Sequence, residues 1–322
     1  MPSKPQSVGG QAVIEGVMMR APEAIATAVR TLDKKITVKV DPYLALSKRY
    51  KILNIPILRG AVSLFEMLVI GIRTLSYSAD VAMKEAQEEE QKKEDNPRTK
   101  RQAFFDELLL GGSLVLALAL GVGLFFFLPL LAAQLLHVSR GALGFNLIAG
   151  GIRIAIFLAY LWAISRWKEI RRIFEYHGAE HKSIFTYEAG EELTVECARK
   201  YSTLHPRCGT SFILIVAISA ILLFSVTDAL FVVTFGHLQN LGERFLTHFT
   251  FLPLVAGASY ELLKLSGKRS EHRIMKAFIA PGLWLQKITT KEPDDEQLEV
   301  ALVALKSALA DDHRKGAKKD NE

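Results

Sequence analysis

Long uncharged stretches separated by charged ones form the main pattern along this chain. Residues 108–136 contain no charged side chain, and such a run can cross a hydrocarbon core of about 30 Å with some tilt. A second uncharged run covers residues 209–227. Two further apolar segments, at about 142–162 and about 249–265, hold only one or two charges each. The pattern predicts a mainly α-helical, polytopic membrane protein with about four transmembrane helices.

In the N-terminal region, apolar and polar residues follow a period of two instead of forming long apolar runs. Apolar and polar side chains alternate over residues 25–30 and again over 35–40, with Leu32-Asp33-Lys34 between them. Alternation around a short polar turn is typical of a β-hairpin, and residues 11–19 are a candidate third strand. We therefore expect residues 1–50 to form a small cytoplasmic α+β unit that contains a β-hairpin.

Residues 56–83 are strongly apolar but carry charges of alternating sign at intervals of seven, at Arg59, Glu66, Arg73 and Asp80. This spacing places all four charges on one stripe of a helix. It favours an amphipathic helix within residues 51–83 that lies at the membrane interface or packs on the cytoplasmic ends of the spans. Re-entrant insertion of this segment is the alternative.

The remaining boundaries follow from changes in composition. Residues 84–104 form a charged linker, and residues 105–266 form the transmembrane region with a polar connection at 167–210. Residues 267–322 form a cytoplasmic C-terminal segment, in which Asp294 or Asp295 can cap a terminal helix that runs to about Ala310.

Positive charge sets the expected orientation. The chain has 322 residues with a net charge of +6 and a pI near 9.2, and most of its Lys and Arg residues lie before the first span or after the second and fourth. The connections on the other side of the membrane, near residues 137–141 and 236–248, contain only two basic residues, Arg140 and Arg244. Both termini and residues 167–208 are therefore expected in the cytoplasm, in a multi-pass protein of the cell (inner) membrane. Attraction to anionic membrane lipid explains the basic pI. Nucleic-acid binding is not expected, because the sequence shows no basic face with interleaved aromatic residues.

No signal peptide is visible in residues 1–50, because no apolar stretch follows a basic start. Both cysteines, Cys197 and Cys208, fall in the connection expected to face the cytoplasm. They should be reduced there, and they do not form a C-x-x-C pair.

The segment His177-Gly178-Ala179-Glu180-His181 carries the clearest chemical signal. Histidines four residues apart lie on one helix face, which suits two ligands to one divalent metal ion. The H-x-x-E-H pattern is that of inverzincins, in which the glutamate, here Glu180, is the general base acting on metal-bound water. The alternative is a pair of core histidines satisfied by hydrogen bonds.

A second candidate segment, residues 205–210, lies directly before the third span. His205 and Cys208 could both complete a closed four-ligand zinc site, or one of them could be the third ligand of an open catalytic site. The alternative is a turn at a helix entrance, with Arg207 extended toward lipid phosphates. Glu261 is a further candidate because it is an ionisable residue within a predicted span, although local pairing with Lys264 is equally compatible.

Four segments occur in an order that resembles the YqhQ-like family of bacterial membrane proteins: residues 9–20, 176–182, 205–212 and 280–286. The resemblance covers nearly the whole chain except the charged linker and the polar tail. It implies membrane residence and a metal-dependent enzyme whose substrate is not assigned. It also gives weight to Glu15, Arg20 and Trp284, which lie within these motifs, as supporting residues.

These observations lead us to expect a zinc-type metal bound by His177, His181 and His205 or Cys208. With Glu180 as catalytic base, the reaction would be hydrolysis of a peptide or lipid-linked substrate at the cytoplasmic membrane face. Glu15, Arg20, Arg207 and Glu261 are expected to support the site. The first alternative is a membrane scaffold or assembly factor with a structural metal. The second is a transporter, for which the few charges near spans and the lack of repeated half-helices offer little support.

Overall fold

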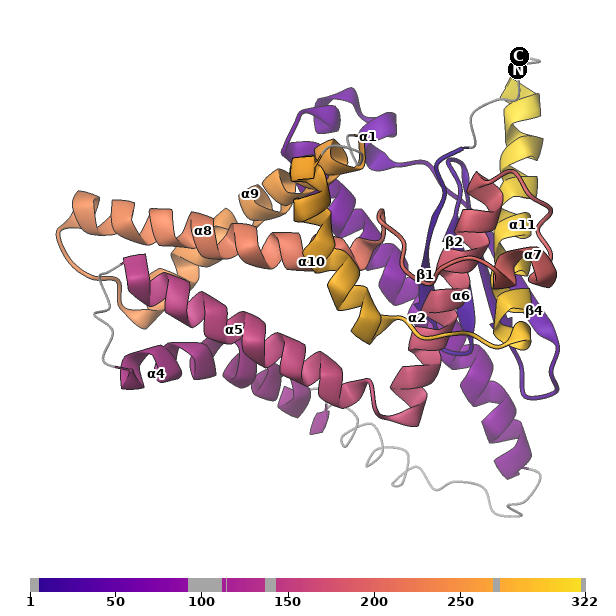
Figure 1. Ribbon diagram of the computed structural model, residues 1–322, viewed down its shortest axis with the longest axis horizontal. Coiled ribbons are helices and arrows are strands. Elements are labelled where there is room, and N and C mark those ends of the chain that lie inside the picture. The colour runs from indigo at the N-terminus through magenta and orange to yellow at the C-terminus, as the bar shows by residue number, and fades with distance from the viewer. Residues whose placement is uncertain (1–5, 92–111, 114, 137–142, 269–272, 320–322) are drawn as a thin grey trace. The chain divides into compact units, whose positions relative to one another are not determined.

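The computed structural model describes residues 6–91, 112–113, 115–136, 143–268 and 273–319 (Figure 1). The chain divides into two compact units, one formed by residues 1–86, 162–215 and 256–322 and the other by 87–161 and 216–255. The described part is mostly helical. The linker predicted at 84–104 lies largely outside the described residues.

A four-stranded antiparallel sheet of order β1-β2-β3-β4 forms the N-terminal part of the first unit. The strands span Gly9–Val13, Gly16–Arg20, Ala24–Arg30 and Ile36–Pro42. Strands β3 and β4 pair from Arg30↔Ile36 to Ala24↔Pro42, which confirms the predicted hairpin. The single strand predicted at residues 11–19 is instead the pair β1–β2, which turns at Ile14 and Glu15. Glu15 has a positive φ of 49°, and its turn breaks a run that looked continuous.

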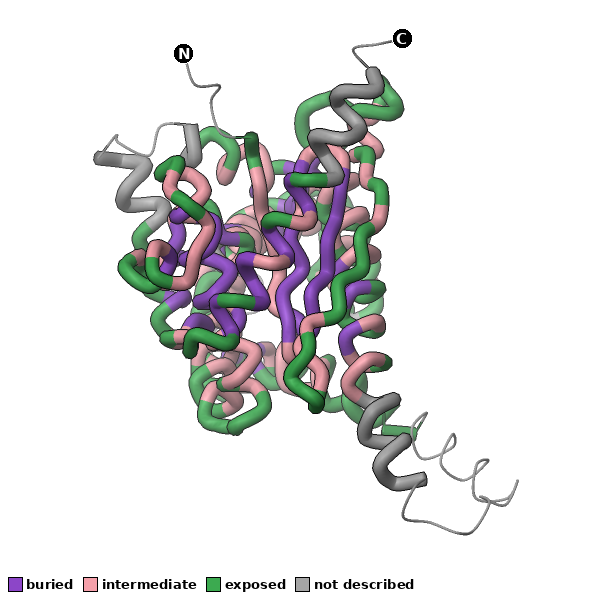
Figure 2. Tube along the Cα trace, turned by 90° about the vertical axis from the view of Figure 1, so that its right-hand side faces the viewer, coloured by how far each residue is buried: buried purple, intermediate pink, exposed green. Residues whose placement is uncertain are grey.

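Both faces of this sheet are covered by helices. Val17, Met19 and Ala28 face a core that includes α11 (Asp295–Lys319). On the other face, Met18 and Val29 contact α2 (Leu58–Gln91). Figure 2 shows the inner strands as extended buried segments.

Helix α2 is therefore the helix predicted from residues 56–83, and it packs on the sheet through residues such as Met67 and Ile70. Its opposite side keeps large apolar residues exposed, including Phe65, Leu68 and Ile72. Before α2, the chain forms the short helical segments α1 (Leu46–Arg49) and η1 (Lys51–Asn54).

Within the described residues, three helices are long and apolar enough to cross a membrane: Val115–Leu135, Gly144–Ile164 and Phe212–Phe235. They coincide with the first three predicted spans. The first contains the π-helical turn η2 (Gly123–Phe127) and α4 (Leu128–Leu135), and the other two belong to α5 (Leu143–Ile164) and α8 (Gly209–Phe235). The predicted fourth span lies within α9 (Leu241–Lys268), a continuous helix containing Pro253 that is not among these three.

The second unit holds a polar cluster on its helices. Asp228 of α8 accepts hydrogen bonds from Asn146 at 2.9 Å and Arg244 at 2.5 Å, and its carboxylate lies 2.8 Å from His248 Nε2. The His248 ring stacks on Phe224 with 4.1 Å between centroids. These contacts satisfy an acidic group within a helix that is otherwise apolar.

Candidate metal centre

Helix α6 (Lys168–Glu188) carries the H-x-x-E-H segment, and the sheet fixes its position. The Glu15 carboxylate, at the β1–β2 turn, accepts hydrogen bonds from Arg172 and from the Tyr176 hydroxyl, the latter at 3.4 Å. Burial raises the pKa of Tyr176, and the hydrogen bond to Glu15 raises that of Arg172. Glu15 thus holds the turn of α6 that directly precedes His177.

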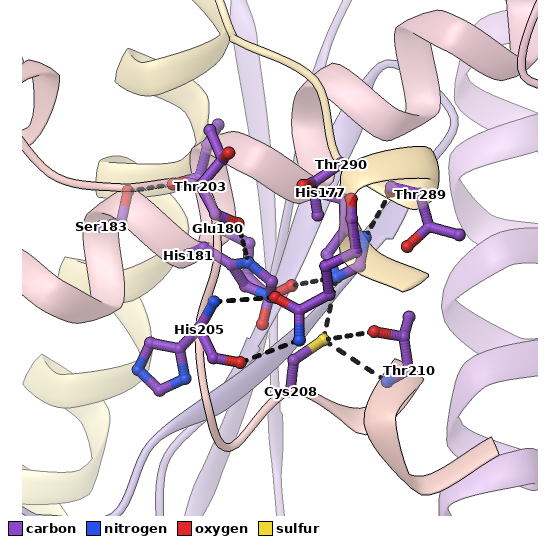
Figure 3. A network of polar contacts seen from close by, with 12 residues as sticks. His177, Glu180, His181, Ser183, Thr203, His205, Cys208, Thr210, Thr289 and Thr290 are labelled. Atoms are coloured by element: carbon purple, nitrogen blue, oxygen red, sulfur yellow. Dashed lines mark hydrogen bonds and ion pairs between the residues drawn. The ribbon is translucent and has the colours of Figure 1, made fainter. Parts of the chain in front are cut away.

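Three side chains converge at the end of this arrangement. One ligand atom each from His177, His181 and Cys208 lies within 4.8 Å of the other two. His177 Nε2 is 3.2 Å from Cys208 Sγ (Figure 3). Cys208 comes from the loop that directly precedes α8. Two residues of one helix and one residue of a distant loop therefore meet at a single point.

Backbone carbonyls hold the far side of both imidazoles. His177 Nδ1 donates to the Thr289 carbonyl at 2.9 Å, and His181 Nδ1 donates to the Thr203 carbonyl at 2.5 Å. A carbonyl can only accept, so these contacts place the ring proton on Nδ1 and leave the Nε2 lone pair free. Metal-binding histidines commonly have such a partner.

His181 Nε2 is buried and has no hydrogen-bond partner within the described part of the chain. Burial lowers the pKa of His181, which favours the neutral ligand form of the ring. A thiol proton on Cys208 can satisfy His177, but this contact leaves the His181 nitrogen unpaired. A buried unpaired nitrogen is costly, and a metal ion held by His177, His181 and Cys208 would satisfy it.

Glu180 lies beside these three ligands but outside the set. Its Oε2 is 3.9 Å from His177 Nε2, and its carboxylate accepts a hydrogen bond from the Gly10 backbone N–H. The residue is 4% exposed, and burial raises its pKa. A carboxylate adjacent to a metal without coordinating it has the placement that a general base needs.

Two glycines make these close approaches possible. A Cβ at Gly10 would lie 2.8 Å from Glu180 Cγ, and one at Gly178 would lie 2.1 Å from the Lys291 carbonyl oxygen. Lys291 follows α10 (Arg273–Thr289) and donates its backbone N–H to Phe174 O at 2.9 Å. Neither glycine stands out in the sequence by itself. Both lie within segments that carry the family resemblance, residues 9–20 and 176–182, and this position is the signal that the sequence offers.

His205, a candidate ligand, lies outside the three-residue set. Its Nδ1 accepts from the Arg207 backbone N–H at 3.3 Å, and its Nε2 is 3.6 Å from Glu188. Figure 3 shows its ring directed away from Cys208. The Gln286 side chain bonds both the N–H and the carbonyl of His205, at 2.8 and 2.9 Å. His205 and Gln286 therefore shape the loop that presents Cys208, and Gln286 is a site residue that sequence analysis missed.

The other supporting candidates lie at varied distances from the centre. Arg20 donates to the Tyr43 hydroxyl at 3.4 Å and to Met67 Sδ at 2.8 Å. Arg207 pairs with Glu188. Glu261 of α9 forms a two-contact ion pair with Arg59 of α2, so it joins two helices and does not reach the metal ligands. Trp284 is 53% exposed.

A cavity of about 320 Å³ opens next to the centre. Glu180, His181 and Cys208 line it, together with Arg20 and Arg207. Two residues of the three-residue set, His181 and Cys208, therefore border a space large enough for a small ligand.

Comparison with known proteins places this chain in a family. A family model described as "Protein of unknown function (DUF1385)" matches residues 55–311. The chain is 32% identical over 314 residues to a Bacillus subtilis (strain 168) protein described as "Uncharacterized protein YqhQ", covering 95% of this chain and 93% of the relative. No solved structure matches the chain significantly.

Proposed function

This chain belongs to the DUF1385 family of proteins of unknown function, and we propose that it is an integral membrane hydrolase that depends on a zinc-type metal. The observation that carries this proposal is the convergence of His177, His181 and Cys208, with both histidine Nδ1 atoms held by backbone carbonyls. The substrate would be a peptide or a lipid-linked molecule presented at the cytoplasmic face.

The number of ligands favours a catalytic site over a structural one. Structural zinc sites close with four protein ligands, whereas catalytic sites have three and keep one position open. Because His205 faces away from Cys208, the described residues offer three ligands at this point.

A zinc-type ion bound there would supply Lewis acidity and activate water for attack. Glu180 would take the proton of the attacking water and return it to the leaving group. The Gly10 N–H orients the carboxylate for this role, and the burial of Glu180 limits its contact with bulk water. Burial, which raises the pKa of Glu180, brings it closer to that of a general base working near neutral pH.

The second candidate function is a scaffold or assembly factor with a structural metal. It is favoured by one observation, which is that the ligands join α6 to the loop before α8. A metal there would fasten two segments that lie 27 or more positions apart in sequence, as the separation of His181 from Cys208 shows.

The three apolar helices support membrane insertion. We propose that α9 adds a fourth span, that both termini and residues 167–208 face the cytoplasm, and that the protein resides in the inner membrane. The distribution of Lys and Arg supports this orientation.

Replacing Glu180 by glutamine separates the two functions. The change preserves the shape of the side chain but removes its basicity, so a hydrolase should keep its metal and lose about 10²–10⁴-fold in activity. Complementation of a deletion strain, together with metal analysis of the purified protein, gives the readout. Glu169→Gln, at an exposed position of the same helix, is the matched control. Full complementation by Glu180→Gln at native expression would contradict the hydrolase and favour the scaffold.

A further inference from the structure

The cavity next to the candidate metal ligands is lined by an apolar wall and by several polar side chains. The wall is formed by Leu64, Met67, Ile184, Phe212, Tyr260 and Leu263. These residues come from α2, α6, α8 and α9, so four helices contribute to one apolar surface. A wall of this kind binds hydrocarbon through the hydrophobic effect.

The apolar wall continues into membrane-compatible surface. Phe212 lines the cavity and is also the first residue of the apolar stretch Phe212–Phe235. Leu64 lines the cavity from α2 and is 41% exposed, and the neighbouring Phe65 and Leu68 are 66% and 58% exposed. A hydrocarbon chain could therefore pass from the lipid phase into the cavity without crossing a polar barrier.

Two arginines, Arg20 and Arg207, line the same cavity as the catalytic candidates. Arg20 forms no ion pair within the part of the chain that the structure describes, and it donates only to the Tyr43 hydroxyl and Met67 Sδ. Tyr43 in turn donates to Glu66 at 3.2 Å. Arg207 is paired with Glu188, and its side chain is 49% exposed. Arg20 thus keeps donors for an anion, and it lines the same cavity as Glu180 and Cys208.

We propose that this cavity binds an amphiphile with one acyl chain along the apolar wall and an anionic headgroup, of the phosphate class, at Arg20 and Arg207. The assignment rests on the proposed function in so far as the amphiphile is the substrate, because its headgroup then lies next to the metal ligands and Glu180. It narrows the substrate class from peptide or lipid-linked molecule to an acidic lipid.

Binding can be measured on the full-length protein purified in a neutral maltoside detergent. The probes are dodecyl phosphate, dodecanol and inorganic phosphate, each titrated by isothermal calorimetry. Dodecyl phosphate, which has both the alkyl chain and the phosphate, should bind at least about tenfold more tightly than dodecanol or inorganic phosphate. The reason is that its headgroup adds charge-assisted hydrogen bonds to the burial of the chain. Equal binding of dodecanol, tight binding of inorganic phosphate alone, or no binding of dodecyl phosphate would each overturn the proposal.

Two pairs of variants locate the binding. Arg20→Gln should weaken dodecyl phosphate at least about tenfold, whereas Arg171→Gln, whose side chain is 62% exposed on α6, should not. Leu263→Trp should fill the cavity and weaken both dodecyl phosphate and dodecanol, whereas Leu265→Trp, at a 43% exposed position of the same helix, should not. Unchanged binding in both cavity variants would refute this location, and Leu263→Trp decides the matter if Arg20→Gln does not fold.

Metal content is measured on the same samples, which separates the two claims. A protein that binds stoichiometric metal but not dodecyl phosphate would overturn the substrate class and leave the metal-dependent function standing. A protein that binds dodecyl phosphate at this cavity but no metal would overturn the metal-dependent function and leave the proposed ligand class standing.

Discussion

Replacing Gly10 by alanine should disturb Glu180 while leaving the metal ligands in place. The added Cβ would lie 2.7 Å from the Met18 carbonyl oxygen, 2.8 Å from Glu180 Cγ and 2.9 Å from Glu180 Oε1. All three distances are below van der Waals contact, and one of the atoms belongs to the backbone of the paired strand β2. The carboxylate must therefore move away or the strands must separate. Overpacking of this kind costs about 1–3 kcal/mol.

Gly9 provides the matched control, because a Cβ there meets nothing within 4 Å. Gly9→Ala should change the free energy of unfolding by no more than about 0.5 kcal/mol. The assay is denaturant unfolding of the purified protein, with metal content and complementation of a deletion strain measured in parallel. We expect Gly10→Ala to be less stable than Gly9→Ala, to keep its metal and to complement poorly. Equal stability and full complementation by both variants would refute the described contact between Gly10 and Glu180.

Two further predictions concern the membrane part. In a Cys197→Ser background, an impermeant thiol reagent on intact cells should label Leu238→Cys but not Glu192→Cys, because the positive-inside rule places position 192 in the cytoplasm; the opposite labelling would invert the proposed orientation. Asp228→Ala should destabilise the protein by about 3–5 kcal/mol, since it leaves Arg244, whose side chain is 12% exposed, without its partner; a shift in thermal unfolding within error of wild type would contradict that estimate.

The spans and the histidine pair could be predicted from local pattern. An uncharged run such as residues 209–227 has few alternatives to a long apolar helix. His177 and His181 share a helix face whatever the rest of the fold does, because their spacing matches one turn. Charge also identified the α2 helix, although its packing on the sheet was not predicted.

The choice between His205 and Cys208 could not be made from sequence. Both residues precede the third span, with Pro206 between them. Their order in the sequence does not indicate which of the two side chains points toward the histidine pair. In the structure Cys208 lies with His177 and His181, whereas the backbone of His205 is held at both N–H and carbonyl by Gln286, 81 positions away. A contact of that range leaves no local periodic signal.

The β1–β2 turn and the role of Gly10 escaped prediction for a related reason. Strand β2 is buried at four of its five positions and β1 is partly buried at four of its five, so neither strand shows the alternation that marks a half-buried strand. Gly10 matters because a side chain from α6 approaches it, and this approach depends on tertiary packing. The residues next to Gly10 in the sequence do not indicate that a side chain of α6 approaches it.

The most direct test of the metal centre is X-ray absorption spectroscopy at the zinc edge on the full-length protein purified with its bound metal. We predict one zinc per chain with two imidazole nitrogens at about 2.0–2.1 Å and one sulfur at about 2.3 Å. Cys208→Ser should remove the sulfur contribution, whereas His205→Ala should leave the spectrum unchanged. Protein without stoichiometric metal, or a spectrum whose sulfur signal survives Cys208→Ser, would contradict the proposed centre.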